Sequence, residues 1–499
     1  MSTVSGVQAT IGSTRRTAPP GSAPVVTASA IVLGLVGSAL LVLAGSGWGG
    51  PRGWFGADTP LGATNVRPRL SHVTSVVGLG LVVLAWLGAG ALVRAGRVGT
   101  RAVVAVATAT ALPLLAGPPL FSADARYYVA VGELVDTGGH PYTQGWSATG
   151  RPDYIGRASS FWSTKPCPYS PGAVRLLQGV AHVTGGDLDR GALVLRVLAT
   201  AGVVTTGVLL VAVTRRTGGT PAAALWLGVG NPVVLLSGVS GAHLDAIVAP
   251  LALGAAACVL VRRPLLAGLL TGLAAQLKVT AFVLLAVVVA WAFLRDRSRT
   301  AARVAALASA ATAVTFVAVS EACRLGWGWV HALSIPATAN TSATPVAAAA
   351  ELAHRAGLVG QVGTQSVPGP SGALQAVAMT VAAATCLTIV AVGRRVAVVE
   401  AAGWATLVVV LAAGAMWSWY LLVPLALIAV APLRRGSWWT SAGLVVLSLV
   451  TLASARPGGG PSASALNARA DLAFLLGYAA AVVLVLVGAV RGRTGRDRS

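Results

Sequence analysis

An aspartate at the end of the third long apolar run is the residue best suited to carry chemistry. It lies in Phe121-Ser122-Ala123-Asp124-Ala125-Arg126-Tyr127-Tyr128. A carboxylate at the mouth of a membrane span is costly unless it has a partner or a function. Asp124 could act as a general base that takes a proton from an attacking hydroxyl group. The alternative, an interfacial aspartate that caps a surface helix, is equally open from these residues.

Two turn-rich segments follow on the same side of the chain. The first is Gly138-Gly139-His140-Pro141-Tyr142, and the second is Lys165-Pro166-Cys167-Pro168-Tyr169-Ser170-Pro171-Gly172. Glycine and proline at this density predict tight, rigid turns. Such loops suit a substrate site, although an ordinary structural loop has the same composition.

Three further ionisable residues lie in apolar surroundings: His243 and Asp245 in Gly241-Ala242-His243-Leu244-Asp245, and Lys278 between two short apolar runs. Ionisable residues at membrane depth usually serve a function. Lys278 could neutralise a lipid phosphate or reach toward the interface. An anionic head group could also be bound by Lys165, Arg126, Arg175 and Arg196, but attraction to lipids in general is an alternative for each. We predict no metal site here, because the spacing offers too few ligands, and a divalent metal is not excluded.

An aromatic segment, Trp417-Ser418-Trp419-Tyr420, falls near another apolar run. Tryptophan and tyrosine concentrate at membrane interfaces. We therefore expect an interfacial belt here, with stacking on a sugar as the alternative.

The composition identifies the elements that must hold these residues. The chain has 499 residues, of which 55% are hydrophobic and only 10% are charged, against about 25% charged in soluble domains. The net charge of +22 lies in short basic clusters at the ends of apolar runs. This pattern is typical of a membrane protein with basic cytoplasmic loops, and it argues against nucleic-acid binding.

Apolar runs long enough to form membrane helices predict an all-α, polytopic transmembrane bundle of about 12–14 spans. We expect a disordered cytoplasmic tail at 1–24, one transmembrane domain at 25–490 and a basic cytoplasmic tail at 491–499. The short pair at 264–277 and 279–294 could form a re-entrant hairpin. The expected spans are near 25–47, 72–93, 102–120, 191–213, 220–239, 244–261, 264–277, 279–294, 302–320, 371–393, 401–416, 418–433, 438–454 and 470–490.

The distribution of charge predicts the orientation. With both termini in the cytoplasm, the short basic loops all lie inside, as positively charged loops of membrane proteins do. Most carboxylates and all six histidines then lie outside or close to the outer face. Two long outer loops, at about 121–190 and 321–370, would hold the chemistry. Cys167 and Cys323 both fall in these loops, and whether they pair is left open.

Several common catalytic motifs are absent from the sequence. It contains neither a G-x-x-x-x-G-K-[S/T] phosphate loop nor H-E-x-x-H. These motifs bind nucleotides and zinc respectively. We therefore predict no cofactor, and a nucleotide sugar is a poor candidate donor.

In these features the sequence resembles the polyprenol-phosphate-mannose-dependent α-1,6-mannosyltransferases of lipoglycan synthesis, a family of the GT-C glycosyltransferase superfamily. The resemblance rests on Asp124-x-x-Tyr127-Tyr128, Gly138-Gly139-His140-Pro141-Tyr142, Pro168-Tyr169-Ser170-Pro171, Asn231-Pro232, Gly241-Ala242-His243-x-Asp245 and Lys278.

The resemblance implies a GT-C-like fold and an inverting transfer of mannose from a polyprenyl-phosphate donor. The acceptor would be an α-mannoside of a mannan or glycolipid on the outer face of the cell membrane. Asp124 would be the catalytic base. The substrate-binding residues would be Arg126, Tyr127, Tyr128, His140, Tyr142, Lys165, Tyr169, His243, Asp245 and Lys278.

Two alternatives remain. A lipid-linked sugar flippase or transporter would need polar groups near the bilayer midplane, where the sequence has few, and no internal repeat is visible. A non-catalytic membrane protein of envelope assembly would not depend on Asp124.

Overall fold

The structure is a computed structural model that describes residues 22–47, 68–336, 344–358, 372–392, 398–431, 438–454 and 468–494. Within these ranges the regular secondary structure is helical throughout, which confirms the all-α prediction. Most of the expected N-terminal tail, the end of the C-terminal tail, and residues 337–343 and 359–371 of the second long loop lie outside the described residues.

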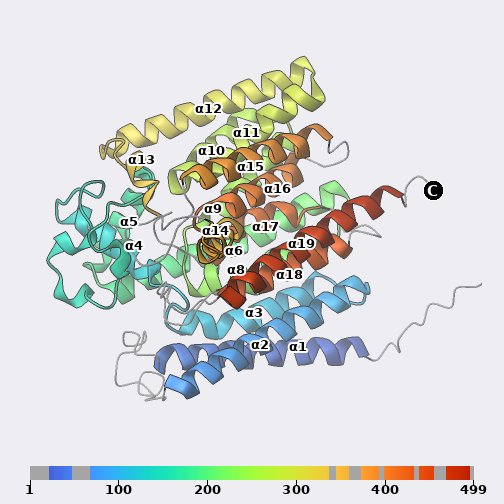
Figure 1. The fold of residues 1–499 in the computed structure, drawn as a ribbon, viewed down its shortest axis with the longest axis horizontal. Helices are drawn as coiled ribbons and strands as arrows, with labels where there is room; N and C mark the ends of the chain where they lie inside the picture. Colours follow the sequence, from blue (N-terminus) through green and yellow to red (C-terminus); the bar gives the residue numbers. More distant parts are fainter. Residues whose placement is uncertain are drawn as a thin grey trace, which may run out of the picture.

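Among the described residues, six helices are long and apolar enough to cross a membrane, and a bent pair is a seventh candidate. These six are α1, α2, α6, the α11 segment, α12 and α15, and shorter apolar helices pack beside them. Figure 1 shows the long helices side by side, with α4, α5 and α13 gathered at one end of the bundle. The polytopic bundle is thus confirmed.

The helices have the following bounds: α1 (Ser22–Gly47), α2 (Pro68–Arg94), α3 (Thr100–Ala116), α4 (Asp124–Asp136), η1 (Trp146–Thr149), η2 (Pro152–Tyr154), η3 (Ser160–Trp162), α5 (Pro171–Thr184), α6 (Leu188–Thr217), α7 (Pro221–Leu227), α8 (Pro232–Val234), η4 (Leu235–Ser240), α9 (Asp245–Leu260), α10 (Pro264–Leu277), η5 (Val279–Ala281), α11 (Phe282–Trp291), η6 (Ala292–Asp296), α12 (Arg299–Cys323), α13 (Trp329–Ala332), α14 (Pro345–Arg355), α15 (Gly372–Val392), α16 (Val398–Ala412), η8 (Ser418–Leu421), α17 (Leu422–Ile428), α18 (Trp438–Ser454) and α19 (Ala468–Thr494).

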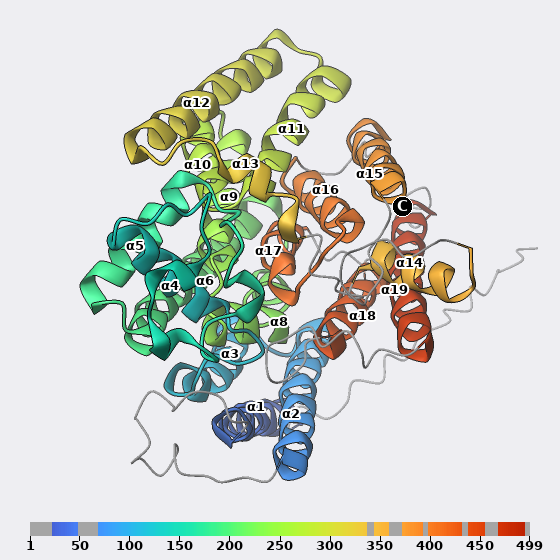
Figure 2. The same cartoon turned by 60° about the vertical axis from the view of Figure 1, so that its left-hand side comes forward.

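The first long outer loop folds into a compact unit that we call the outer cap (residues 121–187). It contains α4, α5 and three short 3₁₀ helices (Figure 2). The α4 helix is buried over most of its length and packs against both α5 and α6. Each end of α4 therefore has a fixed position relative to the membrane helices.

A break in the seventh candidate span shapes the centre of the bundle. α7 and the α8–η4 segment meet at an angle of 53°. The residue before a proline avoids helical conformation, and the break falls at Asn231-Pro232. There the Asn231 side chain accepts a hydrogen bond from the Val233 N–H and caps the new helix. The chain then forms the π-helical turn η4, a geometry that is frequent at functional sites.

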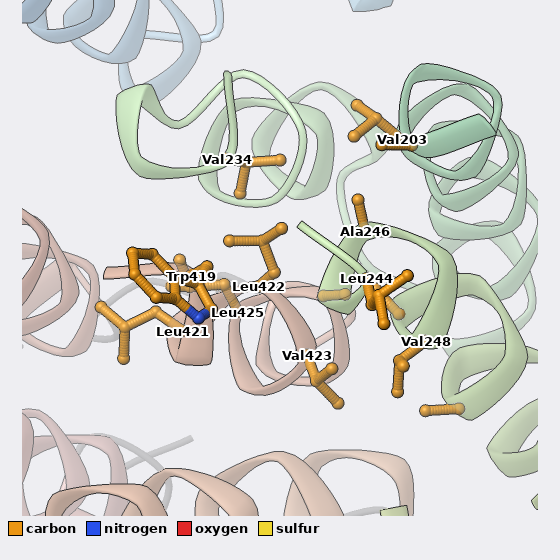
Figure 3. Close-up of a cluster of buried hydrophobic side chains, with 14 of the residues drawn as sticks. Val203, Val234, Leu244, Ala246, Val248, Trp419, Leu421, Leu422, Val423 and Leu425 are labelled. Atoms are coloured by element: carbon orange, nitrogen blue, oxygen red, sulfur yellow. The ribbon is translucent and has the colours of Figure 1, made fainter. Parts of the chain in front are cut away.

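A buried apolar cluster holds this centre together (Figure 3). Leu244 and Val248 of the α9 region lie in it with Leu422 and Val423 of α17, all of which are buried. Gly202 allows α6 to approach α9, since a Cβ at this position would lie 2.2 Å from the Ala246 carbonyl oxygen. The cluster fixes the segments on either side of residue 244.

Two tryptophans join α2 to α7. The Trp86 indole donates to the Trp226 carbonyl oxygen and the Trp226 indole donates to that of Trp86, both at 2.9 Å. Their rings stack with centroids 5.4 Å apart. This reciprocal pair connects the α1–α2 hairpin to the rest of the bundle.

Arg196 of α6 joins this helix to the end of α3 and to the end of η4, near the outer cap. Its guanidinium is fully buried and donates to the backbone carbonyls of Leu115, Gly117 and Ser240. The first two carbonyls lie at the end of α3, and the third ends η4. A planar guanidinium with five donors can reach several acceptors at once.

We predict that Arg196→Lys destabilises the protein, because a lysine ammonium cannot reproduce the fork of hydrogen bonds and leaves buried carbonyls without a donor. The loss should be about 2 kcal/mol or more, seen as a lower unfolding temperature in detergent. Arg190→Lys, at an exposed position of the same helix, is the matched control and should unfold like wild type. Equal stability of both variants would contradict the role given to Arg196.

Candidate active site

Asp124 occupies the first position of α4, directly beyond the end of α3. The turn between these helices includes Phe121 in the left-handed region, with φ of 61°, which is strained for a bulky residue. The Ser122 hydroxyl accepts a hydrogen bond from the Asp124 N–H at 3.0 Å. The carboxylate therefore sits on a turn of defined shape, with 18% of its side-chain surface exposed.

The surroundings of Asp124 favour its protonated form. Burial raises the pKa of this carboxyl from 3.8 to about 7, and the negative charge of Asp245 acts in the same direction. The ammonium of Lys278 and the hydrogen bond from Ser122 lower it. A carboxyl with a pKa near neutrality can accept and release a proton readily at physiological pH.

His243 stands beside Asp124 at the end of the η4 segment. Its Nδ1 lies 3.8 Å from Asp124 Oδ2 and 3.3 Å from the Tyr128 hydroxyl. The imidazole stacks on the Trp419 indole, with centroids 3.7 Å apart and planes 11° from parallel. Ala242 in the left-handed region (φ 53°) turns the chain just before it.

Asp245 and Lys278 form the ion pair of the site. Lys278 Nζ lies 2.6 Å from both carboxylate oxygens of Asp245 and 3.7 Å from the centre of the Tyr420 ring. Lys278 is extended between α10 and α11, and this break in the helix lets its side chain turn inward. The carboxylate and the aromatic face together stabilise an ammonium that is removed from water.

Tyr128 and Tyr169 complete the cluster. Their hydroxyls are 3.2 Å apart, and their rings meet edge to face. The loop that carries Tyr169 is held by Gln276, whose side-chain oxygen accepts from the Gly172 N–H at 2.9 Å. The same amide donates to the Ser320 hydroxyl at 2.6 Å, so α10 and α12 position this loop.

Six of the residues predicted from the sequence therefore converge at one place: Asp124, Tyr128, Tyr169, His243, Asp245 and Lys278. We call this group the outer cluster. Tyr127 is its neighbour: it is buried, its ring lies 5.9 Å from that of Tyr128, and it stacks on Trp162.

The remaining four predicted residues contact other parts of the protein. Arg126 pairs with Asp189 at 3.0 Å, which links α4 to α6. The rings of His140 and Tyr142 contact each other, and Lys165 lies over the Phe161 ring. These contacts indicate a role in holding the outer cap together.

Two aromatic residues that contact the outer cluster were assigned differently from the sequence. Trp419 and Tyr420 were expected in an interfacial belt, and this interpretation was wrong for both. Trp419 is buried against His243, and Tyr420 lies under Lys278. Their place in a short connection between two apolar runs was the available signal.

A small pocket opens beside His243. Its polar wall is made by Ser122, Ser237, Ser418 and the imidazole, and Leu79, Leu120 and Leu452 are among its apolar lining residues. The Ser237 and Ser418 hydroxyls lie 2.9 Å apart. Within the described residues, no group of three or more His, Cys, Asp or Glu side chains could hold a metal ion. Cys167 and Cys323, both described, are free cysteines.

We predict that Lys278→Met lowers stability by about 3–5 kcal/mol, because it leaves Asp245 charged and buried without a partner. Adding Asp245→Asn should restore much of the loss, since neither charge then remains. Unfolding in detergent would be followed for both variants, with Lys165→Met, which removes the only other lysine, as the control. A double variant no more stable than Lys278→Met would argue against the ion pair.

Comparison with known proteins is consistent with this arrangement. The model of the family described as alpha-(1->6)-mannopyranosyltransferase, N-terminal domain, matches residues 31–295, which is just over half of the chain and includes all six residues of the outer cluster. No solved structure matches the chain significantly.

Curated relatives carry the same description. The chain is 31% identical over 278 residues to alpha-(1->6)-mannopyranosyltransferase A of Mycobacterium tuberculosis, covering 53% of this chain and 52% of the relative. It is 29% identical over 244 residues to the protein of the same name from Corynebacterium glutamicum, covering 45% and 49%. The matches thus span about half the length of these relatives. With its family model matched over more than half of its length, the chain belongs to the alpha-(1->6)-mannopyranosyltransferase family.

Proposed function

We propose that this protein transfers a mannosyl unit from polyprenyl-phosphate mannose to an α-mannoside acceptor, a mannan or glycolipid, at the outer face of the cell membrane. The transfer forms an α-1,6 linkage and inverts the configuration of the sugar. Asp124 is the general base.

The single observation that supports this most strongly is a carboxyl group with a pKa near 7 beside a buried cation. When an acceptor hydroxyl attacks the anomeric carbon, Asp124 takes its proton. The bond from that carbon to the phosphate oxygen breaks, and the lipid phosphate leaves with the electron pair. An oriented cation stabilises charge that develops on a leaving group.

Lys278 is suited to stabilise the negative charge that develops on the leaving phosphate. An ammonium has three donors, and the two short contacts to Asp245 leave one for a phosphate oxygen. Because Asp245 and Tyr420 already hold the ammonium in place, little reorganisation is needed when the donor binds.

The arrangement of arginines supports an outward-facing site. Arg101 begins the helical run that leads to Asp124, Arg215 ends the helix that follows the outer cap, and Arg299 begins α12. The other end of α12 meets the cap, where the Cys323 carbonyl accepts from Arg175 of α5. These arginines thus lie at the end of the bundle opposite the cap, as expected for the cytoplasmic side.

Support for mannose comes from the relatives, which are described as alpha-(1->6)-mannopyranosyltransferases. A lipid-phosphate donor is consistent with a site that lies between apolar helices and the outer cap and contains a fixed ammonium.

We predict that Asp124→Asn lowers mannosyl transfer at least about 100-fold, because the amide cannot accept a proton. The assay uses membranes with matched amounts of protein, radiolabelled polyprenyl-phosphate mannose and a short α-1,6-mannoside. Asp153→Asn, at an exposed carboxylate of the outer cap, is the matched control. Equal transfer by wild type and Asp124→Asn would mean that another residue is the general base. Counterflow of labelled donor in vesicles without product would favour a flippase.

The rate should also follow the ionisation of Asp124. The base acts only when deprotonated, so transfer should be maximal above the pKa of about 7 and fall roughly tenfold per pH unit below it. Initial rates between pH 5 and 9, at subsaturating acceptor, would test this. A rate that stays constant down to pH 5 would contradict the raised pKa.

A further inference from the structure

His243 lies between Asp124 and the serine-lined pocket. On one side its Nδ1 faces the Asp124 carboxylate at 3.8 Å. On the other side the ring lines the pocket with Ser237 and Ser418. The side chain is 1% exposed, so the protein holds it there without contact with bulk water.

Under the proposed function, each turnover leaves one proton on Asp124. The next acceptor hydroxyl can be activated only after this proton has left. Asp124 is largely buried, and a bound product would cover it further. The buried carboxyl therefore needs a neighbouring group that can take the proton.

We propose that His243 resets the base: it accepts the proton from Asp124 after transfer and passes it to water at the serine-lined pocket. The O–H bond of Asp124 breaks as the N–H bond at Nδ1 forms. A water molecule in the pocket then takes a ring proton and becomes hydronium, and the ring returns to the neutral tautomer in which Nδ1 carries no proton. The 3.8 Å separation exceeds a direct hydrogen bond, but one bridging water or a small side-chain rotation spans it.

The groups that face His243 make it suitable for passing a proton on and unsuitable for keeping it. The nearby Lys278 ammonium disfavours a second positive charge, although Asp245 neutralises part of its effect. The stacked face of Trp419 stabilises the imidazolium while it exists. The Tyr128 hydroxyl can donate to Tyr169, which leaves its oxygen free to accept from the Nδ1–H once the ring is protonated. The protonated ring is therefore a short-lived state.

Rapid-mixing kinetics on the purified full-length protein in nanodiscs would test this proposal. His243→Gln retains a hydrogen-bonding side chain that cannot carry a proton. We expect a first turnover of one mannose per protein at close to the wild-type rate, followed by a steady state at least about tenfold slower. This loss is smaller than the roughly 100-fold or more expected when a general base itself is removed. Added imidazole should accelerate the slow phase, and D₂O should slow it. His182→Gln, which alters an exposed histidine of the outer cap, should leave both phases unchanged.

Ser418→Ala is a second variant, which leaves the imidazole in place. It should show the same two phases, with a smaller difference between the rate of the first turnover and the steady-state rate. A slow first turnover in His243→Gln, without response to imidazole, would mean that His243 positions a substrate, and would overturn the proposal. A steady-state rate of His243→Gln equal to that of the wild type would also overturn the proposal. It would mean that the departing phosphate carries the proton away. Absence of any transfer by wild type would instead overturn the proposed function on which the reset depends.

Discussion

The low dielectric of the membrane makes every buried charge costly, and the Lys278–Asp245 pair is the interaction on which the site depends. A charge in such surroundings persists only with a partner at close range, and here the ammonium has two carboxylate oxygens at 2.6 Å. Burial raises the pKa of Asp124, and the charge of Asp245 adds to this effect, so the lowering by the Lys278 ammonium is outweighed. The pair thus supplies a fixed cation and also leaves the neighbouring carboxyl poised near neutrality.

The helices around the site are interrupted next to the ion pair and its neighbouring residues. Asp124 follows a left-handed residue at the end of α3, His243 follows another at the end of a π-helical turn, and Lys278 is extended between two helices. Regular membrane helices satisfy their own backbone groups, whereas interruptions must be satisfied by other parts of the protein. Arg196 does this for carbonyls at the first two of these breaks. The ionisable residues of the outer cluster therefore lie at helix ends and breaks.

Much of this arrangement could be predicted from the sequence, because a bilayer leaves a chain few options. Apolar length and basic clusters predict the helices and an orientation, and the scarcity of ionisable residues in apolar runs draws attention to Asp124, His243, Asp245 and Lys278. Sequence patterns could not separate these from Arg126, which pairs with Asp189, a residue 63 positions away. Nor could they separate Trp419 from an interfacial tryptophan, since both have the same local sequence. Long-range packing decides these cases, and it leaves no local signal.

The reciprocal hydrogen bonds of Trp86 and Trp226 have a consequence for biosynthesis. The two residues are 140 positions apart, so α2 enters the membrane well before its partner on α7 has been made. Until then the Trp86 indole must find another acceptor, at the head groups or at the insertion machinery. The first hairpin is thus inserted early but docks late. A chain interrupted before residue 226 would leave the indole N–H of Trp86 without this acceptor, which is costly where only lipid surrounds it.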